Sequence, residues 1–162
     1  RVDPNSLNFV SVGAMGQASS HALGLAIGLP DQKIIVLDGD GSLLMNLSTL
    51  TTIANAAPKN LVHFVIENGI YEANGGHPIP AQGRADLAGM AATAGYAQAH
   101  SYEGLNQFAA DLPDLLAAPG PVFGALKVEA GDAPPLNYDY EWLHSADRRR
   151  EFKDAVRPLL KD

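Results

Sequence analysis

The sequence of 162 residues contains no cysteine. Without cysteine the chain forms no disulfide and offers no thiolate to a metal, so disulfide-stapled scaffolds and cysteine-ligated iron–sulfur clusters are excluded. The absence does not determine the redox compartment, because a chain without cysteine is compatible with oxidising and reducing surroundings alike.

Basic side chains are scarce as well. The chain has 11 Lys and Arg against 18 Asp and Glu, which gives a formal net charge of −7. Nucleic acids and anionic membrane surfaces require clustered basic residues, so neither is an expected partner. No apolar run is long enough to span a membrane, and no basic segment followed by an apolar one indicates a signal peptide. We therefore expect a cytoplasmic protein.

The sequence does contain a regular alternation of strand-like and helix-like segments. With 46% hydrophobic residues, a chain of this length is expected to form a domain with a substantial core. Such alternation is typical of an α/β fold with a doubly wound, mostly parallel sheet flanked by helices. Strands are expected at 8–12, 33–38, 60–68, 96–101 and 121–129, and helices at 18–29, 43–57, 85–95 and 105–118.

Apolar patterning adds detail to this expectation. The strand at 60–68 carries apolar side chains on both faces and the strand at 33–38 is apolar throughout, so both are expected to be buried. The helix at 105–118 is expected to be interrupted near Pro113. Residues 1–131 are expected to form the functional domain, and residues 132–162 a C-terminal tail and helix.

Three unusual loops follow the first three expected strands, where ligands bind in such sheets. They read GAMGQ (13–17), GDGS (39–42) and ENGIYEANGGHPIP (67–80). Their glycines let backbone N–H groups approach an anionic ligand closely. This part of the chain therefore has the backbone of an anion site.

The same region offers almost no positive charge. No Lys or Arg occurs between Lys33 and Lys59, and the acidic Asp40 would repel a phosphate. A divalent cation between Asp40 and the phosphate resolves this conflict, because Mg²⁺ accepts carboxylate, amide and phosphate oxygens together. Asn68, at the end of the neighbouring strand, supplies an amide oxygen.

These residues carry a resemblance to a known family. Gly39-Asp40-Gly41, followed after the 26 residues 42–67 by Asn68, resembles the thiamine-diphosphate-binding motif. The segments GAMGQASS, GDGSLLMN and NGIYEANGGHPIP extend the resemblance over essentially the whole chain, to the diphosphate-binding domain of the decarboxylase and acetolactate-synthase group. Within that group the chain is most similar to the cofactor-binding subunit of sulfopyruvate decarboxylase and to phosphonopyruvate decarboxylase.

The resemblance implies a set of cofactor and metal ligands. The side chains of Asp40 and Asn68 and the backbone carbonyl of Ile70 would bind Mg²⁺. Backbone N–H groups near Gly41 and Tyr71, together with the Ser42 backbone and hydroxyl, would hold the diphosphate. The residues implied in binding thiamine diphosphate are Gly13, Ala14, Met15, Gly39, Asp40, Gly41, Ser42, Asn68, Ile70 and Tyr71.

The resemblance also implies roles around the cofactor rings and the substrate. Met15 falls where the family places a large apolar residue beneath the bent cofactor, and the Gly13 carbonyl would accept from the aminopyrimidine amine. His77 stands where related decarboxylases commonly have glutamine, so it is the candidate catalytic residue, as a general acid or a substrate-anion ligand. Glu67 replaces the usual amide or aspartate before Asn68, which leaves the metal ligands intact.

The resemblance further implies that the chain supplies half of an active site. In the family a glutamate from a separate pyrimidine-binding domain activates the cofactor, and no glutamate of this chain lies in a matching context. A pyrimidine-binding partner subunit is therefore expected, in a heterodimer or a dimer of heterodimers, with a small 2-oxo acid as substrate. Relatives carry a helix and a strand ahead of this region, so further residues are expected before Arg1.

Other functions stay open. The same scaffold serves carboligation, as in acetolactate synthase, and oxidative decarboxylation to an acyl carrier. A non-catalytic regulatory domain would instead bind a metal through Asp38 and Asp40. Simpler structural roles also stay open: Asp38 as the end of a strand, Met15 and His63 as core residues, and His77 as a solvated loop residue.

Overall fold

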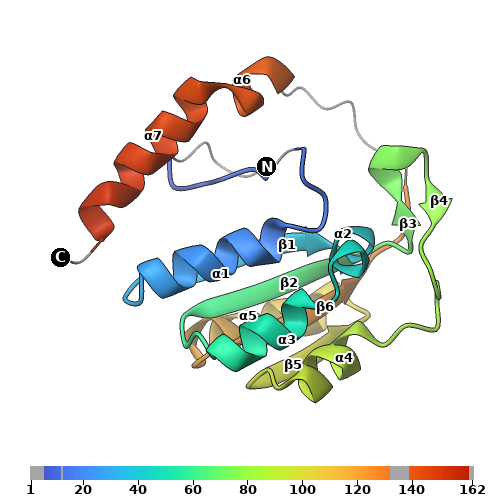
Figure 1. Ribbon diagram of the computed structural model, residues 1–162. Coiled ribbons are helices and arrows are strands. Elements are labelled where there is room, and N and C mark those ends of the chain that lie inside the picture. The colour runs from blue at the N-terminus through green and yellow to red at the C-terminus, as the bar shows by residue number, and fades with distance from the viewer. Residues whose placement is uncertain (1–5, 12, 132–138, 161–162) are drawn as a thin grey trace.

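The computed structural model describes residues 6–11, 13–131 and 139–160 and contains a four-stranded sheet (Figure 1). The strand order is β1-β2-β6-β5, and every neighbouring pair is parallel. The strands are β1 (Ile34–Gly39), β2 (Leu61–Glu67), β5 (Gln98–Tyr102) and β6 (Val122–Lys127). A separate antiparallel ribbon pairs β3 (Ile70–Tyr71) with β4 (His77–Pro78).

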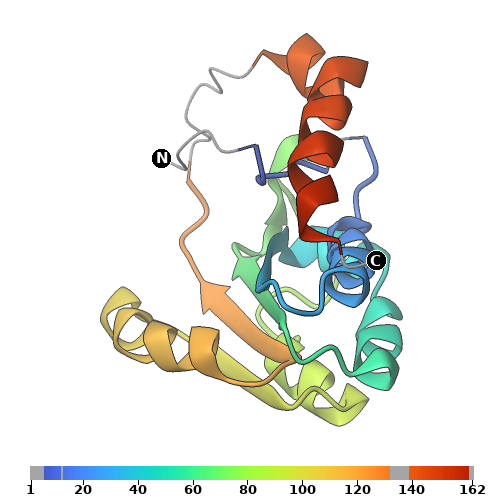
Figure 2. The same ribbon diagram turned by 90° about the vertical axis from the view of Figure 1, so that its left-hand side faces the viewer.

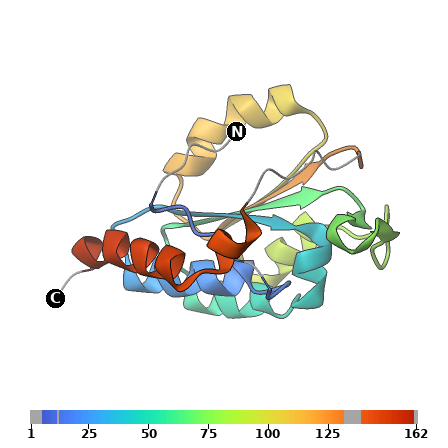
Figure 3. The same ribbon diagram turned by 90° about the horizontal axis from the view of Figure 1, so that it is seen from above.

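Helices cover both faces of the sheet, which confirms the doubly wound α/β fold. Seen from above, α5 lies on one side of the sheet and α1, α3 and α4 lie on the other (Figure 3). The helices are α1 (Ala18–Gly28), α2 (Asp40–Met45), α3 (Thr49–Ala56), α4 (Leu87–Ala94), α5 (Leu105–Ala117), α6 (Tyr140–His144) and α7 (Ala146–Val156), with 3₁₀ turns η1 (Glu72–Asn74) and η2 (Arg157–Leu159). In the described part of the chain, no helix has the length and apolar character needed to cross a membrane.

An apolar cluster lies on each face of the sheet. Val65 and Phe123 belong to the cluster beneath α1, α3 and α4. Val62 and Phe64 belong to the cluster on the opposite face, where Leu115 of α5 packs. Because successive side chains of a strand point to opposite faces, β2 buries both of its faces, as its sequence indicates.

β1 differs from its expected environment. Val36 is buried, whereas Ile35 and Leu37 on the other face are 49% and 62% exposed. The expectation of a strand buried on both faces is wrong, because β1 lies at the edge of the sheet and α5 packs over β2, β5 and β6.

The N-terminal segment also differs from its expected structure. Residues 8–11 form no strand, and residue 12 of that expected strand lies outside the described residues. The segment packs instead beneath the C-terminal helices, as Figures 1 and 2 show. The Phe9 ring lies 5.1 Å from that of Phe152, and the Arg148 guanidinium donates to the Asn8 carbonyl. These contacts hold the segment against α7, so it does not pair with the edge strand β1.

Two helical expectations are corrected. The helix expected at 43–57 is broken into α2 and α3, because Asn46 leaves helical geometry (φ −143°, ψ 51°) and its side-chain amide donates to the Gly16 carbonyl. The interruption expected at Pro113 does not occur, and α5 runs through it. Phe108 and Leu115 pack against the sheet on either side of the proline and hold the helix in place.

Candidate functional site

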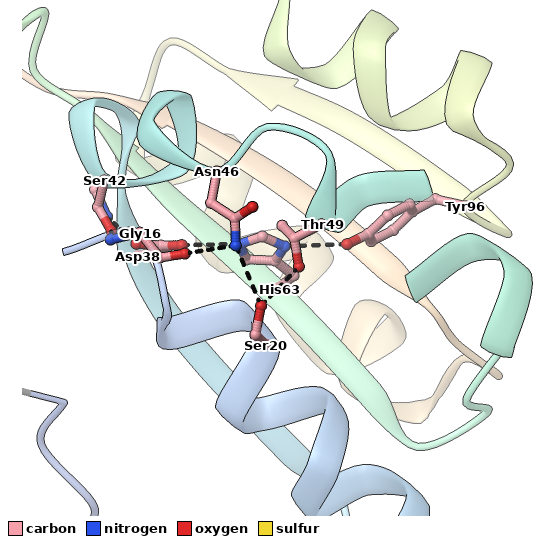
Figure 4. Close-up of polar contacts among 9 residues, drawn as sticks. Gly16, Ser20, Asp38, Ser42, Asn46, Thr49, His63 and Tyr96 are labelled. Atoms are coloured by element: carbon pink, nitrogen blue, oxygen red, sulfur yellow. Dashed lines mark hydrogen bonds and ion pairs between the residues drawn. The ribbon is translucent and has the colours of Figure 1, made fainter. Parts of the chain in front are cut away.

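Three loops meet at the carboxyl end of β1 and β2. Gly41 lies against Tyr71 so closely that a Cβ atom on Gly41 would come within 2.5 Å of the tyrosine ring. On the other side, the backbone N–H of Gly16 donates to the Ser42 hydroxyl oxygen at 3.1 Å (Figure 4). The segments 13–17, 39–42 and 67–80 are therefore adjacent, although no strand precedes the first within the described residues. The second, expected to be a loop, is instead the end of β1 and the first turn of α2.

Asp40 ties two of these loops together. Its side chain is buried, with 1% of the residue exposed. One carboxylate oxygen accepts from the backbone N–H of Gly41 and the other from that of Gly69, both at 2.7 Å. The carboxylate therefore lies at the junction between the end of β1 and the loop that follows β2.

Asn68 organises the loop on the far side of that junction. Its amide oxygen accepts from the Ile70 N–H at 3.0 Å, and its amide nitrogen donates to Glu72 at 3.2 Å. Gly69 between them has a φ of +76°, a conformation that favours glycine. The ribbon that follows places His77 opposite Tyr71, with the histidine exposed.

The loop that carries Met15 is held by a residue that the sequence analysis missed. The Asn46 side chain donates to the Gly16 carbonyl at 3.1 Å and to the Ser20 hydroxyl at 3.4 Å (Figure 4). No sequence signal singled it out, because Asn46 is one of several polar residues in the segment 43–57. Met15 itself is 41% exposed, so in the isolated chain it is not a core residue.

Asp38 does not join Asp40 in an acidic cluster. Its carboxylate is buried and faces His63, with Oδ2 3.6 Å from Nε2 of the histidine. The other ring nitrogen of His63 lies 3.1 Å from the Tyr96 hydroxyl (Figure 4). His63 is thus a buried core histidine with polar contacts on both sides.

A hollow of about 300 Å³ opens beside Asn68, at the carboxyl ends of β2 and β6. Glu67 and Lys127 line it, and they are register partners on the two strands. Burial raises the pKa of Glu67, the negative charges of Asp40 and Asp86 raise it further, and Lys127 opposes the change. Lys127 also forms an exposed ion pair with Glu103 at 2.6 Å.

The donor set at the Asp40 junction fits a hard divalent cation. A carboxylate, an amide oxygen and a backbone carbonyl come from Asp40, Asn68 and Ile70, and Mg²⁺ prefers such oxygen ligands. Among the described residues, no three His, Cys, Asp or Glu side chains gather into a metal cluster. A cation held here therefore needs further oxygens from a ligand, which a diphosphate can supply.

A doubly wound domain with glycine-rich loops at this edge is typical of proteins that bind phosphate-bearing cofactors. The family described as "Thiamine pyrophosphate enzyme, C-terminal TPP binding domain" matches residues 2–124. The chain belongs to this family, which confirms the resemblance carried by its motifs.

Relatives share substantial identity with the chain. The phosphonopyruvate decarboxylase of Streptomyces hygroscopicus is 37% identical over 152 residues, covering 93% of this chain and 37% of that protein. The sulfopyruvate decarboxylase subunit beta of Methanothermobacter thermautotrophicus is 38% identical over 138 residues, covering 83% of this chain and 70% of that protein.

A solved structure shares the fold. The X-ray structure of a thiamin diphosphate-dependent enzyme from Mycobacterium smegmatis superposes with a TM-score of 0.63 at 26% identity, covering 74% of this chain and 23% of that chain. Coverage of the relatives is partial too, since the chain spans 37% and 34% of the lengths of the two Streptomyces phosphonopyruvate decarboxylases that it matches.

Proposed function

We propose that this chain is the thiamine-diphosphate-binding subunit of a heteromeric, cytoplasmic decarboxylase that acts on a small 2-oxo acid of the sulfopyruvate or phosphonopyruvate type. Family membership and the names of the relatives support the proposal. The observation that carries it is the hydrogen bond from Gly69 to Asp40, which brings the two halves of the motif together. In this proposal residues 1–131 are the cofactor domain and 132–162 an accessory tail.

The chain would hold the cofactor through a metal rather than through basic residues. Asp40, Asn68 and the Ile70 carbonyl would hold Mg²⁺, which would neutralise the charge of the diphosphate. Backbone N–H groups near Gly41, Ser42 and Tyr71 would donate to the diphosphate, apart from the Gly41 N–H itself, which donates to Asp40. The Ser42 hydroxyl oxygen accepts from Gly16, so its proton remains available to a phosphate oxygen.

The remaining residues would orient the reacting groups. When bound, thiamine diphosphate supplies an electron sink for the bond electrons left as carbon dioxide departs from a 2-oxo acid. Met15 would support the cofactor rings, and the Gly13 carbonyl would accept from the aminopyrimidine amine. His77, exposed opposite Tyr71, provides a proton or a positive charge to the anionic substrate.

A second subunit would complete the site. The proposal assigns the activating glutamate to a pyrimidine-binding partner, in a heterodimer or a dimer of heterodimers. Apolar side chains are exposed around the Gly13–Gln17 loop, with Met15 at 41% and Met45 at 52%. Side chains of this kind suit burial against another protein better than contact with water.

The test is decarboxylation of sulfopyruvate and phosphonopyruvate with thiamine diphosphate and Mg²⁺. The purified chain is assayed alone and together with a pyrimidine-binding subunit. We expect turnover only when both chains are present. Full activity of the isolated chain would contradict the assignment of a missing glutamate, and formation of an acetohydroxy acid in place of simple decarboxylation would favour carboligation.

A further inference from the structure

A line of polar side chains crosses the apolar core beneath the candidate site (Figure 4). Tyr96, His63 and Asp38 are 6%, 0% and 4% exposed. The Tyr96 hydroxyl lies 3.1 Å from Nδ1 of His63, whose Nε2 lies 3.6 Å from Oδ2 of Asp38. The second carboxylate oxygen of Asp38 accepts from the Gly39 N–H at 3.0 Å. The line therefore runs from the turn between α4 and β5 to the GDG motif.

The protonation of Tyr96 bears on the direction in which hydrogen bonds are donated along this line. Burial raises the pKa of Tyr96, and the negative charge of Asp38 raises it further, so the hydroxyl keeps its proton. A protonated hydroxyl can donate to Nδ1 of His63, and in that arrangement a neutral imidazole carries its ring proton on Nε2. In that tautomer the Nε2–H faces the Asp38 carboxylate at 3.6 Å, so both protons point toward the GDG motif.

A contribution to the free energy of unfolding does not by itself explain why these three polar residues are buried here. Asp38 Oδ2 and His63 Nε2 have no hydrogen-bond partner among the described residues, since 3.6 Å is longer than a hydrogen bond. Buried polar groups of this kind are often replaced by apolar side chains at no cost in stability. The Phe123 ring lies edge-on to His63 at 5.1 Å, so the surroundings are apolar.

The position of Asp38 connects these polar residues to the GDG motif. Asp38 precedes the Gly39 peptide that it holds, and the next residue is Asp40. A shift of the Asp38 carboxylate would remove the acceptor of the Gly39 N–H, one residue before Asp40, whose carboxylate accepts from the Gly69 N–H. Asp38 thus contacts the peptide that leads into Asp40 on one side and faces His63 on the other.

We propose that Tyr96, His63 and Asp38 are positioning residues that act in series to present Asp40 to the cofactor-bound metal. Tyr96 orients the imidazole, the imidazole restrains the carboxylate, and the carboxylate fixes the Gly39 peptide. The last step, to the metal, rests on the proposed function, whereas the restraint on the peptide does not.

The first test measures this restraint without cofactor. Amide hydrogen exchange at Gly39 and Gly69 is compared in the wild type, His63→Phe and Tyr96→Phe. Tyr96→Phe removes a single oxygen atom, so it still tests the restraint if His63→Phe fails to fold. We expect exchange to accelerate about five- to tenfold, the equivalent of one lost hydrogen bond. The matched control is Tyr102→Phe, because Tyr102 is equally buried but lies in the opposite core cluster.

The second test measures thiamine diphosphate affinity at saturating Mg²⁺ by calorimetry, in the chain assembled with its partner subunit. Tyr96→Phe and His63→Phe should each weaken binding, and the double variant should bind no more weakly than His63→Phe, because Tyr96 acts only through the imidazole. A residue with a merely structural role would lower the melting temperature without this non-additive pattern.

The outcomes separate the inference from the proposed function. Unchanged exchange at Gly39 in the variants overturns the inference, whatever the cofactor does. Faster amide exchange with unchanged thiamine diphosphate affinity overturns the claim that these residues orient Asp40 toward the metal. Faster exchange in a protein whose wild type binds no thiamine diphosphate supports the restraint on the peptide and contradicts the proposed function. A ¹⁵N spectrum with the proton of neutral His63 on Nδ1 also overturns the series.

Discussion

The Asp40 carboxylate accepts a hydrogen bond from the Gly69 N–H at 2.7 Å, although the two residues are 29 positions apart. The contact joins the end of β1 to the loop after β2, because these parallel strands are neighbours with Gly39 in register with Ile66. It places the buried carboxylate next to the loop that carries Asn68, the other side chain of the proposed ligand set. Preorganisation of this kind lowers the cost of assembling a metal site.

Asp40→Ala should abolish Mg²⁺-dependent binding of thiamine diphosphate and leave the fold intact. Asp40 is the one charged side chain in the proposed ligand set, and the Gly41 and Gly69 N–H groups lose their acceptor. We expect a stability loss of about 1–3 kcal/mol and an unchanged far-UV circular dichroism spectrum. Asp86→Ala is the control, because it removes a carboxylate that caps α4. Retained affinity in Asp40→Ala would refute the metal assignment.

Met15→Ala should slow catalysis more than it weakens cofactor binding. Met15 is 41% exposed, so truncation should leave the stability of the chain within about 0.5 kcal/mol of wild type. In the complex with the partner subunit, we expect kcat to fall about tenfold or more, because the reacting groups lose their orientation. Steady-state kinetics and calorimetry check this split. Equal losses in kcat and in cofactor affinity would contradict the supporting role.

Asn46→Ala should loosen the loop that carries Met15. The variant removes the donor to the Gly16 carbonyl and the Ser20 hydroxyl, and we expect a loss of about 1–2 kcal/mol in the free energy of unfolding. Amide exchange at Gly16 should accelerate in the same variant. Ser48→Ala is a suitable comparison, because it removes only an exposed contact to the Asn46 side chain. Amide exchange at Gly16 at the wild-type rate would contradict the role of Asn46 in holding this loop.

Tyr96→Phe should change how stability depends on alkaline pH. Because the folded state raises the pKa of Tyr96 above its ordinary value of 10.0, the unfolded chain releases the proton first. Wild-type stability should therefore fall as pH rises beyond about 10, by up to about 1.4 kcal/mol per pH unit from this group. Denaturant unfolding of both proteins between about pH 8 and about pH 11.5 isolates the contribution, since other groups cancel in the difference. Parallel curves would show that Tyr96 titrates normally.

The helix boundaries show which features of the fold local sequence patterns predict and which they do not. Periodicity placed α1, α4 and β2 correctly, because apolar spacing reports which face an element buries. Periodicity also predicted one helix where α2 and α3 are separate, and Pro113 predicted an interruption where α5 is continuous. Asn46 breaks its helix through a contact with Gly16, 30 residues away, and α5 survives Pro113 through packing on the sheet. Neither cause lies within the segment that it affects.

The sequence by itself determined the class of the fold, the family and the motif residues of the candidate site, because alternating elements and the spacing from Asp40 to Asn68 are properties of the linear chain. Only the tertiary structure decided that β1 lies at the sheet edge, that residues 8–11 pack beneath α7, and that Asp38 faces His63. These features depend on strand order and on contacts between distant segments. The physical reason is that burial and hydrogen-bond partners are set by neighbours in space, which periodicity along one strand or helix does not specify.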